Sequence, residues 1–372
     1  MIQADKPYHF KNFADFFKKY QNADQSKKSH ILNEYLKWQS IQGFPAIQDS
    51  RNVVFIYYTD KKEVHSCQVG GDWNWRGNEM KRLDETENFF YRSFKFEPTA
   101  RLDYKFIVNG EWILDPRNPN IMAGGYGSNS ELAMPQFVQP KEILFRSNIS
   151  HGTLEELPDP WKNPKVQVYL PSNYSPTGNY PTVYFTDGTE YLNLASSKNI
   201  LDNLIADKRL QPVIAVFVDP KRKRSTWYRC NLEYLIYLDG LVRYIDDRYA
   251  TNRSTNSRLH VGDSLGGLVS TYVALERPKT FKLVGCQSGA FWAGTDYQIL
   301  EKYQEAPSGL KLKCWFSAGR YEPVIHRDTK KIVSFCKEKG WITKAITQLY
   351  QGHSWGMWRF TLADLLEFFF PF

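Results

Sequence analysis

The chain has 372 residues, which is longer than one hydrophobic core usually serves, so about two domains are expected. Hydrophobic residues make up 42% of it and aromatic residues 16%, which excludes a disordered protein. The formal net charge is +8, but Lys and Arg are scattered apart from one run at 221–224, so we expect no nucleic-acid or membrane partner.

Residues 1–45 are expected to form an N-terminal helical segment. Apolar side chains recur there at helical spacing, as in Phe13, Phe16, Phe17 and Tyr20. The first residues, MIQADKPYHFKNFADFFKKYQ, are charged throughout and lack the apolar core of a signal peptide. No run of about 18 apolar residues follows, so the sequence predicts a cytoplasmic protein unless a leader has been removed.

Residues 46–140 are expected to form an immunoglobulin-like β-sandwich. Short β-rich runs such as VVFIYYTD, FFYRSFKF and LDYKFIVNGEWILD are divided by Gly, Asn, Asp and Pro. This spacing of short strands is typical of a compact sandwich.

Residues 141–372 are expected to form an α/β domain. After two strand-like runs, EILFRS and KVQVYLPS, continuous apolar strands (PTVYFTDG, QPVIAVFVDP, RLHVGDS) alternate with helical stretches. Continuous apolar strands are covered on both faces, which predicts a parallel sheet flanked by helices. The predicted class is therefore an α/β-hydrolase domain preceded by a β-sandwich.

A nucleophile motif lies in this domain. Residues 262–266 read Gly-Asp-Ser-Leu-Gly, which fits GxSxG directly between a predicted strand and a predicted helix. The sharp turn needs small flanking residues, and it places a helix N-terminus where negative charge would develop. Ser264 is the predicted nucleophile.

A serine nucleophile needs a base, and in this fold the order along the chain is Ser, acid, His. His326 and His353 are the histidines downstream, and His353 follows the last strand-like run, where a loop can carry it over the serine. His260, inside the strand before Ser264, is interpreted as a core histidine with a hydrogen-bond partner.

The acid should follow the preceding strand, and two carboxylates are open there. Glu322 is favoured over Asp328 as the group that orients the imidazole. The oxyanion hole should combine the backbone N–H of Leu265 with one from the turn at 186–189, for which Gly188 is the candidate. Five widely spaced cysteines show no CxxC pair and no zinc spacing, so no metal and no cofactor are expected.

Several segments of 141–372 resemble the esterase family that includes enterochelin esterase, feruloyl esterases and mycolyltransferases. The segments are VYLPSNY, YPTVYFTDG, PVIAVFVDP, GDSLGGL, FSAGRYEP and GHSWGMWR, in the family's order. The resemblance implies an α/β-hydrolase in which Ser264 is the nucleophile, His353 the base and Glu322 the acid. The family pattern is broken at RSTWYRCNLEYLIYLDGLVRYID, where we expect the substrate rim, including Arg224 and Trp227.

Residues of about 50–137 resemble the carbohydrate-binding modules of glycogen-branching enzymes and the AMP-activated kinase β subunit. The matching stretches are GGDWNWRGNEMKRL, YKFIVNGEWILDPRNPN and YGSNSEL. The resemblance implies that Trp75 and Trp112 stack on glucan rings beside Lys105. The alternative is that these tryptophans only pack within the protein, because related sandwiches precede hydrolases without binding sugar.

The sequence predicts a carboxylic ester hydrolase that works through an acyl-enzyme. Its substrate would be a siderophore trilactone or similar anionic ester, which the run at 221–224 could attract unless it is a solvated loop, or an acyl or feruloyl ester on a polysaccharide. The alternatives are an acyltransferase with the same triad and a non-catalytic carbohydrate-binding protein on a hydrolase scaffold.

Overall fold

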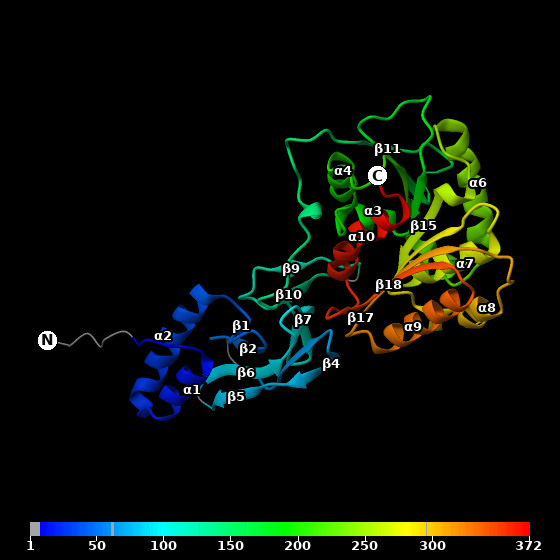
Figure 1. The fold of residues 1–372 in the computed structure, drawn as a ribbon. Helices are drawn as coiled ribbons and strands as arrows, with labels where there is room; N and C mark the ends of the chain where they lie inside the picture. Colours follow the sequence, from blue (N-terminus) through cyan, green and yellow to red (C-terminus); the bar gives the residue numbers. More distant parts are fainter. Residues whose placement is uncertain (1–7, 61–62, 86, 126, 162, 295) are drawn as a thin grey trace. The chain divides into compact units, whose positions relative to one another are not determined.

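The computed structural model describes residues 8–60, 63–85, 87–125, 127–161, 163–294 and 296–372. The chain divides into two compact units, Met1–Val138 and Gln139–Phe372, which are considered separately below (Figure 1). In the part of the chain that is described, no helix is both long and apolar enough to cross a membrane.

The first unit combines a helical hairpin with two antiparallel sheets, of strand order β1-β2-β6-β5 and β4-β3-β7-β10-β9, with β8 beside β7. Its elements are α1 (Phe13–Gln21), α2 (Gln25–Gln42), β1 (Ala46–Ile47), β2 (Asn52–Tyr58), β3 (Cys67–Gly71), β4 (Asn74–Glu79), β5 (Lys81–Asp84), β6 (Glu87–Lys95), β7 (Arg101–Val108), β8 (Glu111–Ile113), β9 (Ile121–Met122) and β10 (Asn129–Ala133).

Strand β2 shows why this unit has three layers. Successive side chains of a strand point to opposite faces, and β2 is apolar on both. Phe55 faces the second sheet, with its ring centroid 4.7 Å from that of Tyr104 on β7. Val54 and Ile56, on the other face, join the aromatic core of the α1–α2 hairpin. The sandwich therefore has one outer face covered by helices.

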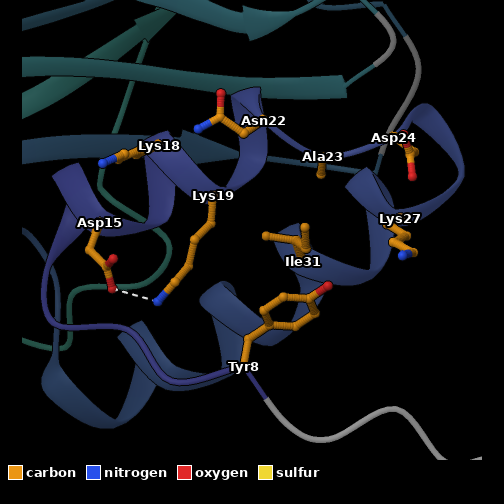
Figure 2. Close-up of a pocket in the computed structure, with 9 residues that line it drawn as sticks. All are labelled: Tyr8, Asp15, Lys18, Lys19, Asn22, Ala23, Asp24, Lys27 and Ile31. Atoms are coloured by element: carbon orange, nitrogen blue, oxygen red, sulfur yellow. Dashed lines mark hydrogen bonds and ion pairs between the residues drawn. The ribbon is translucent and has the colours of Figure 1, made fainter.

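The outer side of the hairpin is polar and hollowed. A cavity of about 520 Å³ lies there (Figure 2), lined by Tyr8, Asp15, Lys18, Lys19, Asn22, Ala23, Asp24, Lys27 and Ile31. Lys19 forms an ion pair with Asp15 at 2.8 Å within it. Helix α1 is amphipathic, with Phe13, Phe16 and Tyr20 buried and Lys18 and Lys19 lining the cavity.

The second unit is an α/β-hydrolase-like sheet of order β11-β12-β14-β13-β15-β16-β17-β18 with helices on both faces. Its strands are β11 (Thr153–Glu156), β12 (Lys165–Leu170), β13 (Thr182–Phe185), β14 (Ile214–Asp219), β15 (Arg258–Asp263), β16 (Leu283–Gln287), β17 (Lys313–Gly319) and β18 (Ile342–Leu349). Its helices are α3 (Gly188–Asn193), α4 (Ser197–Ala206), α5 (Arg224–Trp227), α6 (Leu232–Arg248), α7 (Leu265–Glu276), α8 (Ile299–Glu305), α9 (Pro323–Glu338) and α10 (Trp355–Phe369), with 3-10 turns η1 (Lys141–Ile143), η2 (Lys221–Lys223), η3 (Thr255–Ser257) and η4 (Phe291–Ala293).

Strands β13 to β18 run parallel, whereas β11 and β12 pair antiparallel at one edge. The central strands are buried on both faces: Tyr184 belongs to the core that includes α6 and α7, and its neighbour Phe185 contacts Tyr191 of α3. Figure 1 shows α6 and α7 beside β15 in this unit. The confirmed parallel order brings the carboxyl ends of β13, β15, β16 and β17 to one edge, where ligands bind in such sheets.

One predicted strand is wrong. Residues 142–147 (EILFRS) do not form a strand; the structure has the short η1 turn and then an irregular segment with Leu144 and Phe145 exposed. The carbonyls of 142–144 accept hydrogen bonds from the side chains of Asn199 and Asn203 of α4. The side-chain amides thus supply these carbonyls with the hydrogen bonds that a neighbouring strand would supply in a sheet.

Candidate active site

Ser264 occupies a strained turn between β15 and α7. Its backbone has φ 54° and ψ −117°, which is rare for a residue other than glycine. A Cβ on Gly262 would lie 2.3 Å from the backbone carbonyl group of Gly266, so only glycine fits there. The geometry is that of a nucleophile elbow, which exposes the serine hydroxyl above the end of the sheet.

His353 lies in the loop between β18 and α10 and contacts Ser264. The hydroxyl of Ser264 donates to Nε2 of His353 at 2.9 Å. The edge of the Trp358 ring system lies perpendicular to the imidazole, with ring centroids 5.0 Å apart. The ring is thereby held where it could take a proton from the hydroxyl.

Glu322 contacts the other side of this imidazole. Nδ1 of His353 donates to Oε1 of Glu322 at 2.5 Å. The second carboxylate oxygen accepts from the hydroxyl of Ser288 at 2.9 Å and from the backbone N–H of Gly319 at 2.6 Å. Glu322 is 5% exposed, so these donors compensate its loss of hydration.

The other candidates are placed apart from this chain of contacts. Asp328 is buried on α9 and pairs with Arg327 at 2.9 Å. Nε2 of His326 binds the carbonyl of Thr347 at 2.9 Å. Of the two carboxylates that the sequence leaves open, the structure brings Glu322 to His353.

His260 is confirmed as a core histidine. Its ring nitrogens lie 2.8 Å from the hydroxyl of Tyr234 and 2.8 Å from that of Ser270. Burial lowers the pKa of His260 to about 3, because the charged imidazolium would lose its hydration. The ring is neutral at neutral pH.

Leu265 and Gly188 each begin a helix. Leu265 is the first residue of α7, and Gly188 is the first residue of α3. A backbone N–H at this position has no acceptor within its own helix, and both helices begin at the carboxyl ends of neighbouring strands.

Arg224 and Trp227 lie on α5, in the segment expected to form the substrate rim. Arg224 forms a two-bond ion pair with Asp187, through Nε to Oδ1 and Nη2 to Oδ2, each at 2.8 Å. Trp227 is 2% exposed and belongs to the core, with the ammonium of Lys223 4.7 Å from its ring centroid. The structure thus places Trp227 inside the protein, while the preceding turn Lys221–Lys223 is exposed.

Trp75 and Trp112 lie together on the first unit. They come from β4 and β8, their ring centroids are 6.0 Å apart, and they are 40% and 45% exposed. Gly70 pairs with Lys105 across β3 and β7, and a Cβ on Gly70 would lie 2.8 Å from the Trp112 ring. Because Gly70 has no side chain, the indole of Trp112 can lie against the sheet.

Sequence reasoning missed Ser288 and the carboxylates around Arg224. Ser288 follows β16, and its hydroxyl accepts from Nε1 of Trp358 at 3.0 Å while it donates to Glu322. A polar residue directly after a parallel strand is a usable signal, because strand ends line the site. In the described part of the chain, no cluster of His, Cys, Asp and Glu is arranged to hold a metal ion.

The chain is similar in sequence and in fold to known proteins. The protein YjcH of Bacillus subtilis, which is uncharacterized, is 29% identical over 175 residues, covering 45% of this chain and 71% of YjcH. An endo-1,4-beta-xylanase/feruloyl esterase of Xylanibacter ruminicola is 26% identical over 205 residues, covering 50% of this chain but 28% of that protein. The crystal structure of the enterobactin esterase FES from Shigella flexneri has the same fold, with a TM-score of 0.72 at 20% identity over 86% of this chain and 94% of that one.

The family follows from a longer match. The family described as "Putative esterase" matches residues 160–369. This range runs from β12 to α10 and includes Ser264, Glu322 and His353. This chain belongs to that esterase family.

Proposed function

We propose that the protein is a serine carboxylic ester hydrolase. The observation that carries the proposal is the position of His353, whose ring joins the hydroxyl of Ser264 at 2.9 Å to the carboxylate of Glu322 at 2.5 Å. A nucleophile, a base and an orienting acid in this order are the parts of an activated serine.

The reaction follows from these contacts. Ser264 Oγ attacks the ester carbonyl while its proton moves to Nε2 of His353, and Glu322 stabilises the imidazolium. The N–H groups of Leu265 and Gly188 would stabilise the oxyanion. When the C–O bond breaks, His353 returns the proton to the leaving alcohol, and a water activated by the same imidazole then hydrolyses the acyl-enzyme. No cofactor is needed.

The substrate is proposed to be an anionic ester. Lys221, Arg222 and Lys223 are exposed on the turn that follows β14, next to Arg224. A cluster of like charges attracts substrates of opposite sign. A siderophore trilactone is one such substrate, supported by the fold shared with enterobactin esterase. The alternative is an uncharged acyl or feruloyl ester on a polysaccharide, supported by the feruloyl esterase relative and by the exposed tryptophans of the first unit.

The first experiment is hydrolysis of a short p-nitrophenyl ester by the wild-type protein, by Ser264→Ala and by Ser334→Ala. Ser334 lies on α9 with its hydroxyl bound to Glu338, and serves as the matched control. We expect Ser264→Ala to lose activity by orders of magnitude and Ser334→Ala to keep it. Equal inactivity of wild type and Ser264→Ala on every ester would contradict the proposal.

Active protein would then be offered a siderophore trilactone and methyl ferulate, with and without an added alcohol. Preferential release of the free acid identifies a hydrolase. Transfer of the acyl group to the alcohol in preference to water would instead identify an acyltransferase, which uses the same serine, acid and histidine.

A second function is proposed for the first unit, namely binding of a glucan. The exposed, adjacent rings of Trp75 and Trp112 carry this proposal, because indole faces bind the C–H faces of sugars. Lys105, on the neighbouring strand, could bind sugar hydroxyls. If the second unit proves inactive on esters, this binding remains as the candidate function of the chain.

A further inference from the structure

The residue before the proposed oxyanion donor Gly188 is strained. Asp187 has φ 48° and ψ 46°, the left-handed conformation, at the start of α3. This conformation costs on the order of 1 kcal/mol or more for a residue other than glycine, so it persists only where neighbouring contacts hold it. The direction of the Gly188 N–H depends on this turn, because the two residues share a peptide bond.

The segment that holds Asp187 is α5 and its C-terminal cap. Arg224 donates a hydrogen bond to each carboxylate oxygen of Asp187, both at 2.8 Å. The backbone N–H of Asp187 donates to the hydroxyl of Tyr228 at 3.1 Å, and the Arg224 guanidinium lies 5.6 Å from the Tyr228 ring centroid. A planar guanidinium with two parallel bonds fixes orientation as well as distance.

The same guanidinium also reaches the nucleophile turn. Nη2 of Arg224 lies 3.9 Å from a carboxylate oxygen of Asp263, the residue before Ser264. Asp263 is 1% exposed, and among the described residues its other oxygen, Oδ1, has no hydrogen-bond partner. One partly exposed cation therefore lies between two buried carboxyl groups, of which one precedes the proposed donor Gly188 and the other precedes Ser264.

The two carboxyl groups share one guanidinium. Burial raises the pKa of Asp263 well above its usual range and also raises the pKa of Asp187, and the positive charge of Arg224 opposes both shifts. Removal of Arg224 would therefore leave two buried carboxyl groups without their positive partner.

We propose that Arg224 is a positioning residue, which joins the Asp187–Gly188 turn to the Asp263–Ser264 turn and so aligns the two oxyanion donors. The inference rests on the proposed ester hydrolysis. This role differs from binding the substrate, and two of the five N–H groups of Arg224, one on Nε and one on Nη2, already bind Asp187. The exposed cations at 221–223 remain for an anionic substrate.

The test uses a neutral ester, p-nitrophenyl acetate, so that recognition of a charged substrate does not contribute. Arg224→Met removes the charge, and Arg224→Lys keeps the charge but cannot form the two parallel hydrogen bonds to Asp187. Arg277→Met is the control. Arg277 forms an ion pair with Asp239 at 2.9 Å elsewhere in the same unit. We expect kcat to fall about a hundredfold in both Arg224 variants with KM changed less than threefold, and to stay unchanged in Arg277→Met.

A double variant makes the test specific to the Arg224–Asp187 pair. Arg224→Met combined with Asp187→Asn should be no slower than either single variant, because both remove the same link. If Arg224→Met does not fold, Asp187→Asn, which keeps the side-chain shape, has the same expected loss of kcat.

Three results would overturn the inference. One is an Arg224 variant with wild-type kcat on the neutral ester, and another is a loss that appears only as a raised KM for anionic esters. The third is additive loss in the double variant. Failure of the proposed function looks different: the wild-type protein itself would hydrolyse no ester, and a fluorophosphonate would not label Ser264, in which case both are rejected.

Discussion

Glu322 binds Nδ1 of His353 with one carboxylate oxygen and the hydroxyl of Ser288 with the other. Ser288 in turn accepts a hydrogen bond from Trp358, whose ring system lies edge-on to the imidazole of His353. These contacts form a closed circuit around the imidazole, which fixes both its position and the nitrogen that carries the proton.

Glu322→Gln should lower kcat on a p-nitrophenyl ester by at least a hundredfold, up to about ten-thousandfold. The amide keeps the shape of the side chain but cannot stabilise the imidazolium, and it allows the wrong tautomer of His353. Steady-state kinetics at pH 8 measures the effect. Asp328→Asn is the control, because Asp328 pairs with Arg327 on α9 and should leave kcat unchanged; the reverse order of effects would assign the acid to Asp328.

Gly262→Ala should destabilise the second unit by roughly 1–3 kcal/mol and lower activity in the protein that still folds. The added Cβ would lie 2.3 Å from backbone atoms of Gly266, which a side-chain rotation cannot relieve. Urea unfolding and ester hydrolysis together measure both effects. Gly309→Ala, where nothing lies within 4 Å of the added atom, should be neutral; equal behaviour of the two variants would argue against a tight elbow.

His260 should make the folded state less stable in acid. Its folded pKa, about 3, lies below the ordinary value of 6.5, so the unfolded chain takes up the proton first. The stabilising contribution is complete above about pH 6.5 and is lost progressively as the pH falls toward 3. Between pH 8 and pH 5.5 the wild-type protein should lose about 1.4 kcal/mol more than His260→Gln.

Hydrogen exchange of the β15 amides at increasing urea concentration measures this stability in the unit that contains His260. His65→Gln provides the control, because His65 is exposed on the first unit. A pH dependence that is the same in wild type and His260→Gln would show that His260 is not the group responsible.

Trp75→Ala and Trp112→Ala should each weaken binding of maltoheptaose by about tenfold or more, because each removes one stacking face. Isothermal titration calorimetry on the full chain measures the affinity. Trp292→Ala is a suitable control, since Trp292 is also exposed but lies on η4 of the second unit. No binding by the wild-type protein would restrict the two indoles to a structural role.

Local pattern in the sequence determined the class of each unit and the position of the elbow. Alternation of continuous apolar strands with helices predicts a two-faced parallel sheet, because both faces must be covered. GxSxG predicts the turn at Ser264, because a side chain on Gly262 would collide with the nearby backbone of Gly266. His353 was also predictable, because the fold orders its site along the chain and few histidines follow Ser264.

Tertiary structure decided what depends on partners far apart in the chain. Glu322 and Asp328 are equally acidic in sequence, and only the loop after β17 brings one of them to His353. Arg224 and Trp227 look alike as rim residues, yet one binds a strained Asp187 and the other is buried, because α5 turns them to different neighbours. Residues 142–147 look like a strand, but the carbonyls of 142–144 bind side chains of α4. Hydrogen-bond partners, and not β propensity, therefore determine the conformation of this surface segment.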